Sequence, residues 1–120
     1  MAGGANPYRK GAAFENRVLR LLIEAGHFGL RSPTSASPVD LLVITTHQVY
    51  FIQCKLGGYM RPAEREEVIT LARRYGGVPT LAKPQGKDVT FVDLRTGGNL
   101  DEELCPSAAD SSGSGGGTAS

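Results

Sequence analysis

The chain has 120 residues and a formal charge of +1 at pH 7, a length that suits one domain with a modest core. Its two cysteines exclude the disulfide framework of a small secreted protein, and no Cys/His spacing is typical of a zinc site. No apolar run is long enough to cross a bilayer, so we expect no membrane partner and a cytoplasmic protein, in the host cytoplasm if it is viral.

The charges are unevenly distributed along the chain. Residues 1–100 hold all 13 Lys and Arg but only 8 of the 12 acidic residues, a net charge of +5. Beyond Cys105 the composition is mainly Ser, Gly, Ala and Thr, which offer little to bury. We therefore expect a basic N-terminal arm (1–10), a folded domain (11–100) and a flexible acidic tail (101–120). A basic body favours a polyanionic partner, although an ordinary solvated surface also explains this charge.

A helix is expected at the start of the domain, from Ala12 to the glycine cap at Gly26. Glu15 lies at the edge of its apolar stripe, so this carboxylate can face whatever the helix packs on. Phe28–Arg31 can form a short strand, and a loop of small, polar and proline residues follows over 32–38. The apolar positions that predict the helix, at helical spacing, are Phe14, Val18, Leu21, Leu22 and Ala25.

Two β-rich runs follow the loop, Val39–Thr45 and Gln48–Leu56, with only two residues between them. Both are too apolar for an exposed hairpin and indicate central strands of a covered sheet. A second helix is expected over Ala63–Tyr75, and two more strands over Val78–Ala82 and Val89–Leu94. The order α-β-β-β-α-β-β predicts an α/β fold, with a mixed central β-sheet flanked by helices.

Polar and charged side chains interrupt the two central strands. If their hairpin has no bulge, the numbers of paired residues sum to 93, and Asp40 lies directly opposite Gln53, with Cβ atoms about 5 Å apart. Lys55 projects from the same face as Gln53, whereas Cys54 points the other way and packs as a small hydrophobe. A one-residue bulge would break this arrangement.

Such a cluster can bind a hard divalent cation and cleave a phosphodiester. Asp40, the Gln53 amide oxygen and the Cys54 carbonyl can supply three oxygen ligands. A metal-bound water would be the nucleophile, and Lys55 would orient it or stabilise the developing oxyanion. Glu15 can bind the metal or a metal-bound water. Burying unpaired charges in apolar strands is costly, which favours a site over a chance pattern, but a structural Asp40–Lys55 ion pair is an alternative.

The same residues resemble the signature of the PD-(D/E)xK nucleases. More narrowly, the chain resembles the archaeal-type Hjc Holliday junction resolvases over roughly residues 8–95. The resemblance implies a restriction-endonuclease-like fold, αβββαββ. The motifs that carry it are, in chain order, Arg9-Lys10-Gly11, Glu15, Arg31 with the serine-containing loop that follows, Pro38-Val39-Asp40, Gln53-Cys54-Lys55 and the helix end with Gly76-Gly77.

The resemblance implies a homodimer that binds four-way DNA junctions and cuts two strands symmetrically with Mg²⁺ or Mn²⁺. The catalytic carboxylates of the family correspond to Glu15 and Asp40, and its lysine corresponds to Lys55. The serine of its mobile loop corresponds most naturally to Ser35, with Ser32 and Ser37 as alternatives. The basic residues that flank the site are expected to contact phosphates, with binding that weakens as salt rises: Arg9, Lys10, Arg31, Arg61 and Arg65.

The chain departs from the family motif at Gln53, which is normally Glu or Asp. A neutral amide oxygen replaces an anion there, so the metal affinity should fall. The enzyme can tolerate this change if Glu15, Asp40 and Glu64 carry the negative charge, or it can bind junctions without cutting them. We favour an active enzyme because the rest of the motif is intact. A related nuclease that acts on flaps or linear duplex is a further alternative.

Overall fold

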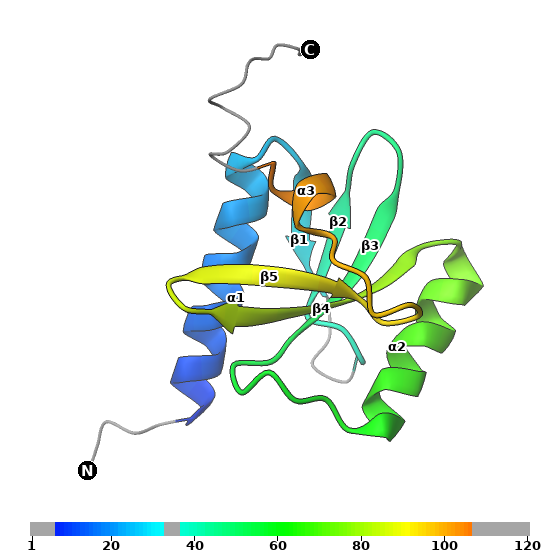
Figure 1. The fold of residues 1–120 in the computed structure, drawn as a ribbon, viewed down its shortest axis with the longest axis horizontal. Coiled ribbons are helices and arrows are strands. Elements are labelled where there is room, and N and C mark those ends of the chain that lie inside the picture. The colour runs from blue at the N-terminus through cyan, green and yellow to red at the C-terminus, as the bar shows by residue number, and fades with distance from the viewer. Residues whose placement is uncertain (1–6, 33–36, 107–120) are drawn as a thin grey trace.

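The structure is a computed structural model that describes residues 7–32 and 37–106. This part of the chain contains three helices and five strands (Figure 1). None of the described helices is long and apolar enough to cross a membrane. The elements are, in chain order, α1 (Pro7–Glu24), β1 (Phe28–Arg31), β2 (Leu41–Ile44), β3 (Val49–Cys54), α2 (Pro62–Tyr75), β4 (Val78–Gln85), β5 (Asp88–Asp93) and α3 (Asp101–Leu104).

The strands form one sheet in the order β1-β2-β3-β4-β5. All neighbours are antiparallel except β3 and β4, which are parallel and joined by α2 as a crossover. The predicted mixed sheet is confirmed, as are the types and order of the predicted elements. Their boundaries differ at some ends: β2 is shorter than the predicted run Val39–Thr45, and β4 extends past Ala82 to Gln85.

The helices α1 and α2 cover opposite faces of the sheet (Figure 1). On the α1 side, Val18 packs with the strand residues Tyr50 and Ile52, and Cys54 adjoins them. On the α2 side, Val68 packs with Phe51. Burying one such apolar side chain stabilises the fold by about 1.5–3 kcal/mol. Since side chains alternate along a strand, β3 directs Cys54 towards α1. It directs Gln53 to the opposite face, towards α2, as it does Phe51.

The glycine pair after α2 has two separate structural roles. Gly76 caps the helix in the left-handed region, with φ of 73° and its N–H directed to carbonyl groups of the last turn. Gly77 packs directly on β3, because a Cβ added there would overlap the Phe51 ring and lie 2.9 Å from the Val49 carbonyl oxygen. Backbone cannot yield as a flexible side chain can, so this position requires glycine.

Gly77→Ala is therefore expected to lower the free energy of unfolding by about 1–3 kcal/mol, because the added methyl group overpacks the interface between α2 and β3. Urea-induced unfolding followed by circular dichroism measures the change. Gly57→Ala is the matched control, since a Cβ there would meet nothing within 4 Å and its φ is not positive. Equal stability of the two variants would contradict this account of Gly77.

The helix α1 begins earlier than predicted. It starts at Pro7 rather than Ala12, so the last residues of the predicted arm 1–10 are helical. Proline suits a first helical turn, because its φ is preset and its missing N–H would have no partner there. The apolar periodicity begins only at Phe14, which explains why it could not show this first turn.

The predicted tail also begins too early. Asp101–Leu104 forms α3, and Leu100 and Leu104 are buried against the α1-side core. The Asp101 carboxylate accepts the Phe91 N–H at 2.7 Å. The His27 ring donates to the Leu104 carbonyl oxygen at 2.6 Å. Two leucines four residues apart are enough to anchor this segment, although the composition around them is polar. The tail from residue 107 onward lies outside the described residues.

Candidate active site

A β-bulge shapes the site at the start of β2. The β2–β3 register follows the predicted sum of 93, with Leu41 opposite Ile52. Asp40 precedes β2, and its N–H donates to the carbonyl oxygen of that same Ile52 at 2.8 Å. Asp40 and Leu41 therefore both lie opposite Ile52, as two residues lie opposite one in a β-bulge. The bulge directs Asp40 towards α1, so the prediction that Asp40 faces Gln53 directly is wrong.

On the α1 side of the sheet, two carboxyl groups lie together. Asp40 Oδ2 accepts the Cys54 N–H at 2.9 Å, and the carboxyl group of Glu15 adjoins Asp40. Burial raises the pKa of Asp40; the hydrogen bond from Cys54 opposes this rise, and the neighbouring Glu15 adds to it. Glu15 Oε1 also accepts Arg31 Nη1 at 3.1 Å, and Arg31 bonds to Asn16. The guanidinium of Arg31 thus offsets part of the acidic charge.

Cys54 packs on this same side as a small apolar residue. Its side chain adjoins the α1-side core, on the face opposite to Gln53, as predicted. Burial, with Asp40 and Glu15 nearby, raises the pKa of the Cys54 thiol well above its ordinary value. The thiol therefore stays protonated at neutral pH, which disfavours a role as a nucleophile.

On the α2 side, Lys55 forms an ion pair with a helix residue. Lys55 Nζ lies 2.8 Å from Glu64 Oε2, and Glu64 Oε1 accepts the Arg61 N–H at 3.0 Å. The hydrogen bond from Lys55 is the main cause that lowers the pKa of Glu64. The alternative of a structural ion pair between Asp40 and Lys55 is not realised, because Lys55 pairs with Glu64 instead.

Gln53 presents an oxygen without a partner. Its Oε1 is buried and accepts no hydrogen bond from any described residue. In the parallel register Gln53 pairs with Leu81, which belongs to the α2-side core. A buried amide oxygen without a donor costs about 1–3 kcal/mol, and this cost is relieved when a ligand binds that oxygen.

Comparisons with known proteins bear on what this arrangement does. A family model described as archaeal Holliday junction resolvase (Hjc) matches residues 6–102. The chain is also 31% identical over 113 residues to the crossover junction endodeoxyribonuclease Hjc of Methanocaldococcus jannaschii, and the match covers 86% of this chain and 84% of that protein. The chain belongs to the archaeal Hjc family. Its fold is similar to that of Hjc from Archaeoglobus fulgidus, with a TM-score of 0.62 at 24% identity over 81% of this chain and 88% of the other.

Members of the Hjc family are Holliday junction resolvases, so the chain is an endodeoxyribonuclease. The predicted family and the restriction-endonuclease-like fold are confirmed. Nucleases of this family generally depend on a divalent metal ion.

The oxygen donors of the predicted site are of the kind that a hard divalent cation prefers. Glu15 and Asp40 place two carboxyl groups side by side, an unfavourable arrangement that a cation relieves. The unpartnered Gln53 Oε1 is also an oxygen of the kind that such cations prefer, but β3 directs this side chain to the α2 side, opposite to the two carboxyl groups. No three His, Cys, Asp or Glu side chains gather as a metal cluster in the described part of the chain. Among the described residues, the carboxyl groups that come together on the α1 side are those of Glu15 and Asp40.

The structure describes some of the other predicted site residues and not others. Ser35 and the side chains of Arg9 and Lys10 lie outside the described residues. Arg61 is 70% exposed and lies 3.6 Å from Glu64. Arg65 donates to the Leu94 carbonyl oxygen at 2.9 Å, a contact that ties α2 to the end of β5. Of the alternatives for the loop serine, Ser37 Oγ accepts the Val39 N–H at 3.2 Å, and the Ser32 N–H donates to the Asp40 carbonyl.

Two features of the site did not follow from sequence reasoning. The bulge at Asp40 has no composition signal, because it depends on which carbonyl the Asp40 N–H selects. The pairing of Lys55 with Glu64 had a partial signal: Glu64 stands three residues after the residue that caps α2, where a carboxylate commonly folds back over the helix start.

Proposed function

We propose that this chain resolves four-way DNA junctions by metal-dependent phosphodiester hydrolysis, at a site formed by Glu15, Asp40, Gln53 and Lys55. The observation that carries the proposal is the pair of adjacent carboxyl groups at the bulge, beside a lysine, in a chain of the Hjc family. We further propose that the described residues belong to one nuclease domain and that the protein acts in the cytoplasm, where DNA is accessible.

Each residue of the proposed site has a distinct part. Asp40 and Glu15 would hold the cation with the Cys54 carbonyl, and the Gln53 amide oxygen would be a further ligand if its side chain turned from the α2 side towards them. All of these ligands are oxygens, which favours Mg²⁺, with Mn²⁺ as a substitute. The bound cation supplies an activated water and neutralises charge on the phosphodiester. Lys55 donates to the phosphate or to the attacking water, because its Nζ is held in place by Glu64 at 2.8 Å.

The substrate is held by basic residues around this site, together with the loop serine, Ser35. These contacts are to phosphates, so binding weakens as salt rises and does not need the cation. Among the basic residues that the structure describes here, Arg61 has a side chain that is largely exposed to solvent. The residues proposed for this role are Arg9, Lys10, Arg31, Arg61 and Arg65.

Gln53 supports a second candidate function, junction binding without cleavage. Incubation of the purified protein with strand-labelled four-way junctions, flaps and linear duplex in Mg²⁺ or Mn²⁺ separates the possibilities. We expect paired, symmetric cuts in four-way junctions alone. Equal cutting of flaps or duplex would favour another nuclease activity, and junction binding without cutting at any cation concentration would favour the second candidate.

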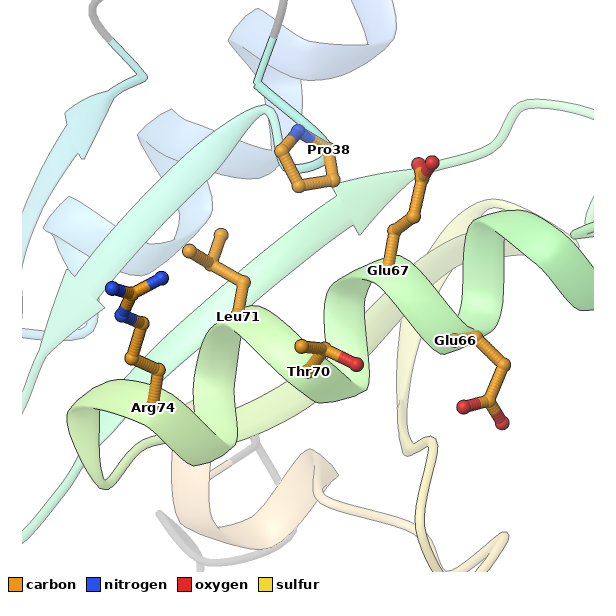
Figure 2. Close-up of a pocket in the computed structure, with 6 residues that line it drawn as sticks. All are labelled: Pro38, Glu66, Glu67, Thr70, Leu71 and Arg74. Carbon is orange, nitrogen blue, oxygen red and sulfur yellow. The ribbon is translucent and has the colours of Figure 1, made fainter.

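We also propose that two copies associate through the α2-side face of β1 and β2. The helix α2 packs on β3 and β4, and it leaves Phe28 and Ile44, which pair across β1 and β2, 67% and 39% exposed. A groove beside this face runs along α2, where Leu71 projects near Pro38 (Figure 2). The cost of exposing so much apolar surface on a small chain supports burial in a dimer.

Charge complementarity supports a second copy as the occupant of this face. Glu66 and Glu67 line the groove in the first half of α2, and Arg74 lines it in the last turn (Figure 2). A two-fold axis places the same surface on both partners, so antiparallel α2 helices bring the acids of one copy near the arginine of the other. A symmetric dimer presents two equivalent sites, as cutting two strands requires.

Phe28→Glu is expected to weaken the dimer by at least about tenfold, because it places an unpaired charge in the buried apolar contact. Analytical ultracentrifugation over a range of protein concentrations measures the dissociation constant. Ile23→Glu is the matched control: Ile23 is 50% exposed but lies on α1, away from this face. A monomeric unaltered chain, or equal weakening by the two variants, would contradict the proposed surface.

A further inference from the structure

Lys55 presents an electrostatic problem for the proposed cation site. Its side chain is only 26% exposed, so water screens its charge incompletely. The family motif has a carboxylate two residues earlier, but this chain has the neutral Gln53. Lys55 is also close enough to Asp40 for the two charges to interact. Without a nearby anion, Lys55 would repel a divalent cation and compete with it for Asp40.

We propose that Glu64 is the positioning residue that solves this problem, and that it supplies the negative charge that Gln53 lacks. The proposal rests on the function proposed above and deepens it. Glu64 holds Lys55 Nζ at 2.8 Å on the α2 side of the sheet, whereas Asp40 lies on the α1 side. Lys55 thereby forms its ion pair with Glu64 and not with the Asp40 carboxylate, and its remaining N–H groups can donate to the phosphodiester.

The position of Glu64 suits this role. Its second oxygen accepts the Arg61 N–H at 3.0 Å, so the carboxylate is fixed by backbone as well as by Lys55. It lies in the first turn of α2, where the helix dipole favours a negative charge. The remaining acids of α2, Glu66 and Glu67, lie on its exposed surface and form none of the described ion pairs.

The test is isothermal titration of Mn²⁺ into the full chain without DNA. We expect Glu64→Gln to weaken Mn²⁺ binding at least about tenfold, because the unbalanced Lys55 charge, which already interacts with Asp40, would repel the cation. Glu24→Gln makes the same change in net charge on an exposed residue at the far end of α1, and it is expected to leave affinity unchanged. Thermal unfolding of each variant verifies that it is folded.

A second substitution separates charge balance from a purely structural role. Adding Gln53→Glu to the Glu64→Gln variant returns a carboxylate next to Lys55, and it is expected to restore Mn²⁺ affinity. Unaltered affinity in Glu64→Gln, or no recovery in the double variant, would overturn this inference. If the unaltered chain bound no Mn²⁺, the proposed metal-dependent function would fail, and the role of Glu64 would fail with it.

Discussion

Asp40→Asn is expected to lower the rate of junction cleavage about a thousandfold, because a loss of roughly 4 kcal/mol of metal-assisted stabilisation falls on the transition state. The variant should keep its fold, since an amide oxygen can still accept the Cys54 N–H that now bonds to Asp40 Oδ2 at 2.9 Å. Junction affinity without metal should stay within about threefold, because binding rests on phosphate contacts. Single-turnover cleavage and gel-shift assays measure the two quantities separately.

Asp88→Asn is the matched control for Asp40→Asn. Asp88 is an exposed acid at the start of β5, in the hairpin with β4, and has no part in the proposed site. The Asp88→Asn variant should cut junctions at the normal rate. Normal cleavage by Asp40→Asn would count against the bulge carboxylates as the metal site, whereas loss of both binding and cleavage would indicate a folding defect and would not support a metal role.

Lys55→Ala is expected to reduce the cleavage rate at saturating junction about a hundredfold or more, because the donor to the phosphate or attacking water is removed. Glu64, which is 24% exposed, can then be hydrated, so the domain should remain folded. The loss should appear in the rate at saturation and not in junction affinity. Such a split identifies a group that acts in the chemical step.

Lys87→Ala provides the comparison for Lys55→Ala. Lys87 is an exposed lysine in the turn between β4 and β5, and its removal changes the net charge equally. Its cleavage rate should match that of the unaltered chain. If Lys55→Ala also cut junctions normally, the assignment of Lys55 to the chemistry would be wrong. If both variants lost only affinity, the lysines would act merely as phosphate contacts.

The elements with clear periodicity could be predicted from the sequence. The helix α2 and the strands β2 and β3 have strong local patterns, because a buried face repeats every two or three to four residues. The ends of the chain were harder. Pro7 precedes the first apolar position of α1, and α3 depends on Leu100 and Leu104 reaching the core. The composition around a residue does not show whether that residue contacts a core formed by distant parts of the chain.

The residues of the site could be predicted from the sequence, but their arrangement in space could not. Asp40, Gln53 and Lys55 were identified by residue type and by their place in apolar strands, and the family assignment brought in Glu15. The hairpin register was also predicted correctly over β2 and β3. The bulge then altered which side of the sheet Asp40 occupies. One backbone hydrogen bond, from the Asp40 N–H to Ile52, decides this.

By itself, then, the sequence determined the order of the elements, the family and the residues that can do chemistry. These depend on side-chain type and on short-range spacing, which the chain carries locally. Only the tertiary structure decided that Asp40 joins Glu15 on the α1 side and that Lys55 pairs with Glu64 on the α2 side. Both outcomes depend on how separate elements pack, since Lys55, which follows β3, meets Glu64 only when the fold brings the end of β3 next to the start of α2.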